Sequence, residues 1–322
     1  MRVTTDWRKA QVKSTKVIAS GVRKLTFAVD GELPPFDAGS HTNIRVEING
    51  TPAVRTYTCL PDGPGNLSIA VKLHPQSRGG SRFMWALAQG DEVELSAPEN
   101  RFELSWSAPH YLLMAGGIGI TPIYGMARTL AARGASMRMV YGALDKASMP
   151  FADELAGLLG NNIAFYEAAK EQFIDLEAEI SALPQDAELY VCGPIGILNA
   201  VKKAWQASGR PVSRLRFEVF GDNGKFAEHP FQVQVVGKDI TVDVPADQSL
   251  LDALRNAGVE MISECERGEC GLCAVGIVSC EGEIDHRDVF FSDREKQENH
   301  KMCSCVSRLV SGKALIDVGY RA

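Results

Sequence analysis

The cysteines near the C-terminal end of the sequence constrain its fold more than any other feature. Five of them follow the pattern C-x4-C-x2-C and, further along, C-x-C: Cys265, Cys270, Cys273, Cys303 and Cys305. A C-x4-C-x2-C run with a distant fourth cysteine holds a 2Fe–2S cluster by four thiolates. The small residues Gly268 and Gly271 would let backbone N–H groups approach the cluster sulfides. The spacing therefore predicts a 2Fe–2S site.

Other chemistries of clustered cysteines fit this spacing less well. Structural zinc favours C-x2–4-C pairs on both sides, whereas here a triple faces a C-x-C pair. A thioredoxin-like pair at Cys270 and Cys273 would open a helix after a parallel strand, and this motif does not. Disulfides are disfavoured because the start of the chain lacks a signal-peptide pattern. The spacing alone leaves both Cys303 and Cys305 open as the fourth ligand.

Length, charge and hydrophobic runs bound the class of protein. A chain of 322 residues predicts two or three domains, since a domain usually holds roughly 100–200 residues. The net charge of -6 argues against a nucleic-acid-binding surface. The longest uncharged run, Tyr111–Ala127, is shorter than the ~20 residues that span a bilayer, and Gly and Pro interrupt it. We therefore expect a cytoplasmic protein that binds neither nucleic acid nor membrane.

The first third of the chain has the pattern of an all-β domain. Apolar and polar residues alternate at 25–29, 44–48 and 67–73. This period of two predicts half-buried strands, and clusters of Gly, Pro and Asn between them mark turns. We expect residues 1–107 to form a small β-barrel.

Within this barrel, the segment Arg55-Thr56-Tyr57-Thr58 has the side chains that could grip a flavin. The cation suits a phosphate, the aromatic ring suits the isoalloxazine, and the hydroxyl suits a ring heteroatom. A strand with ordinary outward polar residues explains the tetrapeptide as well. The segment 77–82, with glycines and hydroxyls, leads into the helical pattern at 83–88 and could form a phosphate site.

The period changes at His110. An apolar run at 111–115 meets the glycine-rich turn 116–122, and a helical pattern continues to Arg133. This order suits a phosphate cradle, although it is neither G-x-G-x-x-G nor a P-loop. Elements of both kinds then alternate: strands at 137–141, 163–166, 189–191 and 215–219, and helices near 151–159, 174–183 and 194–207. We predict a doubly wound parallel sheet over 108–220, with Cys192-Gly193-Pro194 at a ligand-binding strand end.

The last third begins with a turn-rich stretch, so we expect a linker at 221–229. Strands are predicted at 231–236, 240–244, 274–279 and 314–318. Ser249 should open a helix to Asn256, with Asp252 as its capping acid and Gly258 as its stop. Two strands, a helix and the cysteine loop suggest a ferredoxin-like β-grasp domain over 230–322.

These motifs, in this order, resemble the phthalate dioxygenase reductase family, and vanillate demethylase reductases look similar. The resemblance rests on Arg55–Thr58, Gly116–Pro122, Cys192–Pro194, the cysteine run, Asp285–Asp288 and Cys305–Arg308. It implies a flavin-binding Greek-key β-barrel, a doubly wound NAD-binding domain and a C-terminal plant-type 2Fe–2S ferredoxin domain.

The resemblance also implies cofactors and contacts. It implies FMN rather than FAD, and NADH as the hydride donor. The implied flavin contacts are Arg55, Thr56, Tyr57, Thr58 and Lys72, with Gly80, Ser81 and Arg82 near the phosphate and Phe220 over the ring. The implied NAD contacts are Gly117, Gly119, Thr121 and Pro122, with Cys192 beside the nicotinamide and Asp145 at the ribose 2′-hydroxyl. The implied cluster ligands are Cys265, Cys270, Cys273 and Cys305.

The expected function is that of an NADH-dependent reductase that passes electrons from FMN to the cluster and on to a Rieske-type aromatic-ring oxygenase. No side chain is assigned as a general acid or base, because the reaction needs none. We also expect a monomer when the protein is free. Two alternatives stay open: a reductase for another acceptor, such as a diiron hydroxylase, and a non-catalytic iron–sulfur redox sensor.

Overall fold

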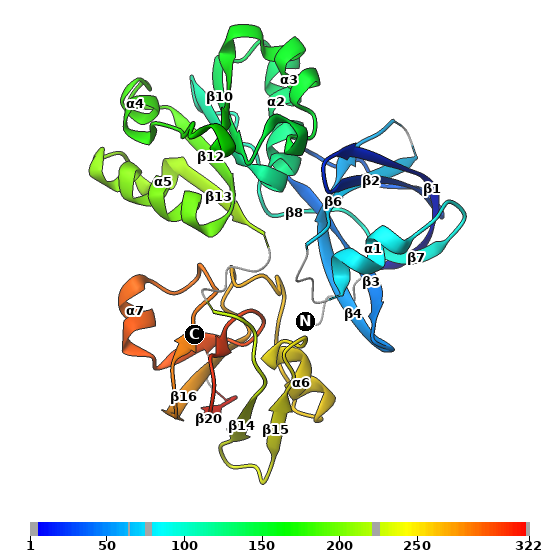
Figure 1. Cartoon of the computed structure of the whole chain (residues 1–322), viewed down its shortest axis with the longest axis vertical. Helices are drawn as coiled ribbons and strands as arrows, with labels where there is room; N and C mark the ends of the chain where they lie inside the picture. The colour runs from blue at the N-terminus through cyan, green and yellow to red at the C-terminus, as the bar shows by residue number, and fades with distance from the viewer. Residues whose placement is uncertain (1–5, 64, 75–78, 221–225, 320–322) are drawn as a thin grey trace. The chain divides into compact units, whose positions relative to one another are not determined.

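The computed structural model describes residues 6–63, 65–74, 79–220 and 226–319 (Figure 1). The chain divides into two compact units, residues 1–218 and 219–322. The first unit contains the two N-terminal sheets, and the second contains the cysteine-rich sheet. The predicted boundaries at 107/108 and 220/221 stay predictions.

The N-terminal sheet has eight antiparallel strands in the order β4-β3-β7-β1-β2-β6-β5, and β8 pairs with β3. The strands are β1 (Trp7–Ala19), β2 (Val22–Val29), β3 (Ser40–Ile48), β4 (Thr51–Thr58), β5 (Leu60–Pro61), β6 (Asn66–Lys72), β7 (Glu92–Ser96) and β8 (Glu99–Asn100). The helix α1 (Gly80–Ala86) adds Met84 to a core that includes Leu25, Phe27 and Ile44. This confirms the predicted β-barrel.

Strand β6 differs most from the predicted alternation, and Thr26 of β2 is buried as well. Leu67 to Val71 of β6 are all buried, including Ser68 and Ala70. Ser68 can be buried because its hydroxyl donates to Asp62 at 2.5 Å and lies 2.7 Å from the Thr26 hydroxyl. The prediction of a half-buried strand was therefore wrong for β6, since a polar network satisfies its second face.

The second sheet has the order β11-β10-β9-β12-β13, and β9 pairs in parallel with both β10 and β12. Its strands are β9 (Tyr111–Gly116), β10 (Met137–Ala143), β11 (Ile163–Glu167), β12 (Glu188–Gly193) and β13 (Leu215–Val219). Its helices are α2 (Ile120–Ala132), α3 (Ala152–Leu159), α4 (Leu176–Ser181) and α5 (Ile195–Ala207), with short 3-10 turns η1 (Gly117–Gly119), η2 (Lys146–Ser148), η3 (Gly160–Asn162), η4 (Ala168–Lys170) and η5 (Val212–Arg214). The doubly wound prediction is confirmed. Helix α4 is shorter than predicted because Asp175 caps it, accepting from the N–H of Ala178 at 3.0 Å.

The C-terminal sheet has the order β15-β14-β20-β16-β18, in which β14 and β20 are parallel and the other neighbours antiparallel. Its elements are β14 (Phe231–Val235), β15 (Thr241–Val244), α6 (Leu250–Asn256), β16 (Ala274–Cys280), α7 (Asp293–Glu298), β18 (Lys301–Cys303) and β20 (Lys313–Asp317), and β17 (Ile284–Asp285) pairs with β19 (Arg308–Leu309) beside them. Ser249 caps α6 by accepting from the N–H of Asp252 at 3.0 Å, and Gly258 follows at φ 76°. Both the β-grasp and this helix were predicted correctly.

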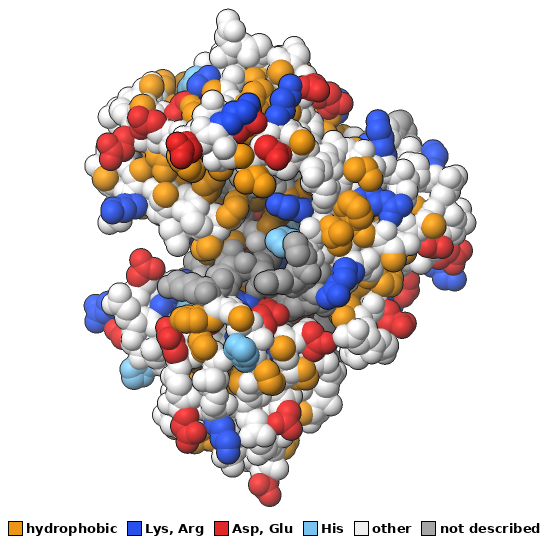
Figure 2. All heavy atoms as spheres, in the orientation of Figure 1, with side chains coloured by type: hydrophobic (Ala, Val, Ile, Leu, Met, Phe, Trp, Pro, Cys, Tyr) orange, Lys and Arg blue, Asp and Glu red, His pale blue; other side chains and the backbone are white. Residues whose placement is uncertain are grey.

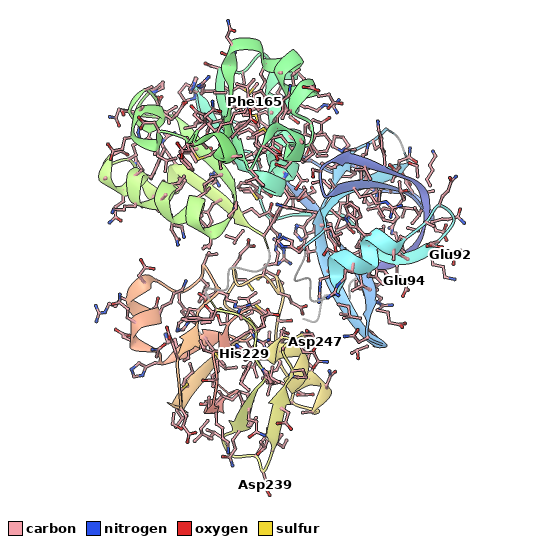
Figure 3. All side chains as sticks on the ribbon, viewed as in Figure 1. Glu92, Glu94, Phe165, His229, Asp239 and Asp247 are labelled. Atoms are coloured by element: carbon pink, nitrogen blue, oxygen red, sulfur yellow. The ribbon has the colours of Figure 1, made fainter. Side chains whose placement is uncertain are left out.

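Two buried arginines attach the start of the second unit to its sheet. Arg287 donates to Glu228 at 2.8 Å and to the carbonyl of Phe226 at 3.2 Å. Arg308 donates to the carbonyl of His229 at 3.2 Å; His229 is labelled in Figure 3. Of the predicted linker, Gly221–Lys225 lies outside the described residues.

The described helices include none that is long and apolar enough to cross a membrane. On the face shown in Figure 2, acidic and basic side chains are interspersed with apolar ones on both units.

Candidate redox sites

The predicted flavin tetrapeptide lies at the end of β4. Alternation along the strand puts Arg55 and Tyr57 on one face and Thr56 and Thr58 on the other. Thr56 donates to the side-chain oxygen of Asn43 at 2.7 Å, and Thr58 is buried. Burial raises the pKa of the Tyr57 phenol, and the charge of Arg55 opposes that rise only in part. Tyr57 therefore offers a neutral aromatic ring.

The start of α1 packs closely on this strand. A Cβ atom on Gly80 would lie 2.7 Å from Nε of Arg55, and one on Gly79, where φ is +98°, would lie 2.4 Å from Ile48. The positive φ of Gly79 favours glycine, and a side chain at Gly80 would displace Arg55, so the start of the helix lies against the Arg55 side chain. This combination of a cation and helix N–H groups fits a flavin phosphate.

The other predicted phosphate residues are also near the start of α1. Ser81 accepts from the N–H of His74 at 3.3 Å, and Arg82 is exposed. Lys72 is the exposed last residue of β6. Ser77 and Arg78 lie outside the described residues.

The carboxyl ends of β9 and β12 meet at the point where the strand order reverses, which is where such sheets bind nucleotides. A Cβ atom on Gly119 would lie 2.3 Å from the carbonyl oxygen of Cys192, and one on Gly193 would lie 3.0 Å from Cα of Gly116. Gly117 has a φ of +54°. The glycine-rich turn and Cys192 are therefore brought together at one backbone crossing.

Thr121 connects this nucleotide site to the flavin strand. Its hydroxyl lies 3.2 Å from the hydroxyl of Thr58 and 3.2 Å from the carbonyl oxygen of Ile118. Both threonines are buried. Pro122 is buried beside Thr121 in the first turn of α2, where proline costs no hydrogen bond.

Asp145, just after the carboxyl end of β10, is also a helix cap, which the sequence did not indicate. Its carboxylate caps η2 by accepting from the N–H of Ser148 at 2.9 Å. Glu167, the last residue of β11, was not singled out in the sequence although it lies close to the same site. It accepts from the Lys146 N–H at 3.1 Å and from the Lys170 ammonium at 2.8 Å. The Lys170 and Lys146 hydrogen bonds lower the pKa of Glu167. A carboxylate at the end of a neighbouring parallel strand was the signal that could have found it.

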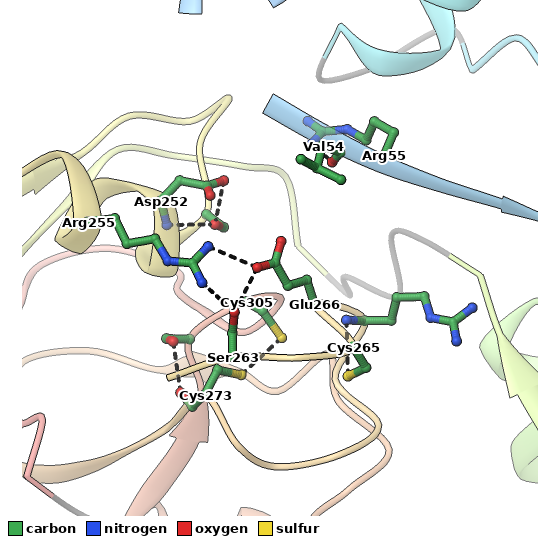
Figure 4. A network of polar contacts seen from close by, with 12 residues as sticks. Val54, Arg55, Asp252, Arg255, Ser263, Cys265, Glu266, Cys273 and Cys305 are labelled. Atoms are coloured by element: carbon green, nitrogen blue, oxygen red, sulfur yellow. Dashed lines mark hydrogen bonds and ion pairs between the residues drawn. The ribbon is translucent and has the colours of Figure 1, made fainter. Parts of the chain in front are cut away.

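In the loop that begins at Cys265, backbone N–H groups donate hydrogen bonds to the Cys265 sulfur (Figure 4). The Cys265 sulfur accepts from the N–H groups of Arg267, Glu269 and Cys270, each at 3.4 Å. Gly268 at φ +75° makes this wrapping possible, since a Cβ there would lie 2.6 Å from Val306. The hydrogen bond from the Cys270 thiol lowers the pKa of Cys265 to about 5, aided by the three N–H groups against the effect of burial. A lowered pKa favours the thiolate of Cys265, which is the form that binds metal.

The remaining cysteines form a second group. The sulfurs of Cys273 and Cys305 lie 3.1 Å apart (Figure 4), and Cys303 belongs to the same buried cluster. Hydrogen bonds from the Cys303 and Cys305 thiols lower the pKa of Cys273 to about 3. Two thiolates on one tetrahedral ion with bonds of about 2.3 Å are about 3.8 Å apart, so the sulfurs of Cys273 and Cys305 would have to separate to hold one iron between them. The contact shows that the loop with Cys273 and the turn with Cys305 bring their sulfurs to one place.

Among the described residues, no three His, Cys, Asp or Glu side chains are grouped as a single metal ion would require.

The predicted flavin residue Phe220 follows β13 directly and is half-buried in the second unit. Its position over the flavin stays a prediction.

Three family models match the chain in the predicted order. The Oxidoreductase FAD-binding domain matches residues 9–104, the Oxidoreductase NAD-binding domain matches 113–203, and the 2Fe-2S iron-sulfur cluster binding domain matches 233–310. The fold and these matches define a three-domain flavin, NAD and iron–sulfur oxidoreductase.

Relatives narrow the class. The chain is 34% identical to phthalate dioxygenase reductase of Burkholderia cepacia, covering 92% of each chain. It is 32% identical to vanillate O-demethylase oxidoreductase of Pseudomonas sp. strain HR199 / DSM 7063, covering 95% of this chain and 98% of the relative. A solved structure of phthalate dioxygenase reductase matches with a TM-score of 0.81 at 32% identity, over 97% of this chain and 98% of that one. The chain belongs to the phthalate dioxygenase reductase family, which confirms the predicted NADH-dependent flavin and iron–sulfur oxidoreductase.

Proposed function

We propose that this protein is the reductase component of a Rieske-type aromatic-ring oxygenase, and that its flavin is FMN. The observation that carries the proposal is the match over nearly the whole chain to phthalate dioxygenase reductase, with all three domains in the same order. A second relative is named vanillate O-demethylase oxidoreductase, and vanillate is an aromatic compound. The choice of FMN over FAD rests on the family alone.

In the flavin site, the chain supplies binding and orientation. When bound, the flavin takes up a hydride and releases electrons singly, which is the chemistry that the protein side chains cannot provide. We assign the phosphate to Arg55 and to Gly80, Ser81 and Arg82 at the start of α1. The strand residues Thr56, Tyr57 and Thr58 would hold the ring system, with Lys72 at the end of β6 and Phe220 over the flavin face.

In the nucleotide site, Gly117, Gly119, Thr121 and Pro122 would hold the pyrophosphate and the nicotinamide, with Cys192 beside the nicotinamide. Asp145 would bind the ribose 2′-hydroxyl. One of its oxygens accepts from Ser148, and a carboxylate has acceptor capacity for a further donor. A negative charge here also disfavours the 2′-phosphate of NADPH.

In the cluster site, we assign the irons to Cys265, Cys270, Cys273 and Cys305. The close sulfur contact between Cys273 and Cys305 and the N–H groups on Cys265 support this set. No general acid or base is assigned, since hydride and electron transfer need none.

The test is reconstitution with a partner. The purified protein should contain FMN by mass analysis of the extracted flavin, and NADH should bleach both flavin and iron–sulfur absorption. It should then reduce a purified Rieske oxygenase faster than it reduces a diiron hydroxylase. A faster reaction with the diiron enzyme would contradict the proposed partner, and the absence of steady NADH oxidation with cytochrome c would favour a redox sensor. Gel filtration should give the mass of a monomer, 34.9 kDa.

A further inference from the structure

Tyr141 of β10 is a buried tyrosine beside the glycine-rich turn to which the proposed function gives no role. Its side chain is fully buried, and the parallel pairing of β10 with β9 puts Tyr141 opposite Ala115, just before the turn. The Tyr141 hydroxyl oxygen lies 3.2 Å from the carbonyl oxygen of Gly117 and 3.5 Å from that of Pro150. A phenol has one proton to donate, and the nearer acceptor is Gly117.

Two groups donate to the Gly117 carbonyl oxygen. One is the Tyr141 hydroxyl, and the other is the backbone N–H of Ile120, the first residue of α2. Burial raises the pKa of the Tyr141 phenol, so the hydroxyl keeps its proton at neutral pH. Gly117 is a glycine at φ +54°, and a glycine can turn its peptide group at little steric cost. The hydroxyl therefore holds in one orientation a peptide group that the sequence leaves free to turn.

The direction of this carbonyl also sets the direction of the next N–H group. The peptide between Gly117 and Ile118 is planar and trans, so its C=O and N–H point to opposite sides. Since the Gly117 oxygen points to the buried Tyr141 hydroxyl, the Ile118 N–H points away from it. The turn is open here, because Gly117 and Ile118 are only half-buried, and a Cβ atom on Gly117 would meet no atom of the described residues within 4 Å.

We propose that Tyr141 positions the glycine-rich turn so that the Ile118 N–H donates to the pyrophosphate of the pyridine nucleotide. This inference rests on the proposed function, which assigns the nucleotide to Gly117 and Gly119. Backbone N–H groups just before and within the first turn of a helix suit an anion, and α2 begins two residues after Ile118. Tyr141 acts through one peptide group and does not touch the nucleotide, so it is a positioning residue.

The experiment measures flavin reduction by stopped flow at increasing NADH concentration in Tyr141→Phe, which removes the hydroxyl and keeps the ring. The NADH concentration at half-maximal rate should rise about three- to tenfold, because a single hydrogen bond has a modest net worth. The 3.2 Å contact is longer than most O–H···O bonds, which also argues for a modest effect. The limiting rate should stay within about twofold, because the pyrophosphate contact is the same before and during hydride transfer.

A hydride donor without phosphate separates positioning from general damage to the fold. N-benzyldihydronicotinamide carries the reacting ring but no pyrophosphate, so it should reduce the flavin of Tyr141→Phe as fast as that of the parent protein. Tyr111→Phe is the matched control. Tyr111 is also buried, and its hydroxyl donates to the carbonyl oxygen of Ser105 at 2.9 Å, at the opposite end of β9 from the turn. This variant should keep the half-saturating NADH concentration of the parent.

The outcomes separate this inference from the proposed function. An unchanged half-saturating NADH concentration in Tyr141→Phe would overturn the inference and leave the reductase function intact. Equal losses of rate with NADH and with N-benzyldihydronicotinamide would overturn it as well, because Tyr141 would then only support the fold. A parent protein whose flavin is not reduced by NADH would instead contradict the proposed function.

Discussion

Thr121 at the start of α2 and Thr58 at the end of β4 lie with their hydroxyl oxygens 3.2 Å apart, which joins the nucleotide domain to the flavin strand. Both side chains are buried, so this contact fixes the helix that begins at the nucleotide turn relative to the residues assigned to the flavin. Hydride transfer needs the two reacting atoms about 3–3.5 Å apart, and small displacements are costly.

Thr58→Val should therefore slow flavin reduction by NADH. We expect a fall of roughly tenfold in the rate at saturating NADH, with a loss of about 1 kcal/mol in the free energy of unfolding. Stopped-flow absorbance of the flavin measures the first and urea unfolding the second. Thr129→Val, which removes a bond from Thr129 to its own helix at Gly125, is the control. Equal rates in both variants would show that the hydroxyl contact does not position the reactants.

A second prediction concerns the crossing of β9 and β12. Gly119→Ala would place a methyl group 2.3 Å from the carbonyl oxygen of Cys192, so the strand ends must separate. Flavin should stay bound while NADH reduces it at least about tenfold more slowly, because the nucleotide site is displaced. Gly157→Ala in α3 is the control, since a Cβ there meets nothing within 4 Å. It should be neutral or stabilise the protein by up to about 1 kcal/mol. Unaltered NADH kinetics in Gly119→Ala would exclude the crossing from the site.

The sequence predicted the elements whose patterns are local. The Gly-rich turn at 116–122 and the helix cap at Ser249 are each indicated by a few neighbouring residues, and both lie where they were predicted. The long first strand β1 was missed because only its pairing with β2 and β7 stabilises it as a strand, and these partners are distant in sequence. Helix α7 was missed although Ser292 and Glu295 form a capping box, because its face is exposed and lacks an apolar period.

The sites could be predicted only as far as residue types allow. The cysteine spacing indicated the chemistry, but it could not distinguish Cys303 from Cys305, since the last residue of β18 and a residue of the turn after it both lie in one buried cluster with Cys273. The role of Asp145 as a cap and the place of Glu167 beside it depend on how the ends of β10 and β11 pair. Such long-range register is not contained in a local pattern.

A third prediction tests the phosphate role of Arg55. Arg55→Ala removes a guanidinium that packs on Gly80 at the start of α1. A charge-assisted hydrogen bond is worth about 1.5–3 kcal/mol, so flavin affinity should fall roughly 10- to 100-fold. Fluorescence titration of the apoprotein with FMN measures it. Arg45→Ala is the control, because it also removes an arginine of the barrel, but one that pairs with Glu94 of β7 at 2.6 Å and is not assigned to the flavin. Retention of full flavin affinity by Arg55→Ala would refute the assignment.

A fourth prediction is a dependence of barrel stability on pH. Burial alone would raise the pKa of Asp62, but hydrogen bonds from Ser68, Thr26 and Lys24 lower it. The folded-state pKa thus lies below the value of about 3.9 in the unfolded chain. The stabilisation of the fold by the ionised Asp62 carboxylate is complete above the unfolded-state pKa, and it is lost as the pH falls through the folded-state pKa.

Asp62→Asn should therefore cost about 1 kcal/mol in the free energy of unfolding at pH 7, given that Asp62 is partly exposed. The difference from the parent protein should shrink below about pH 4. Urea unfolding followed by flavin release measures both. Asp30→Asn, at an exposed carboxylate, should leave the pH profile unchanged. A difference that stays constant down to pH 3 would rule out the ionised Asp62 network as its source.

The last prediction concerns the fourth cluster ligand. The sulfur of Cys305, in the turn after β18, lies 3.1 Å from that of Cys273, whereas Cys303 is the last residue of strand β18 and is fully buried. Cys305→Ser should remove the iron–sulfur absorption and most of the iron, because three thiolates do not complete a 2Fe–2S centre. Flavin reduction by NADH should persist, while cytochrome c reduction should fall at least about tenfold because the path through the cluster is lost. Cys303→Ser is the matched variant and should keep its iron. The reverse pattern, with iron lost in Cys303→Ser and kept in Cys305→Ser, would exchange the roles of the two cysteines.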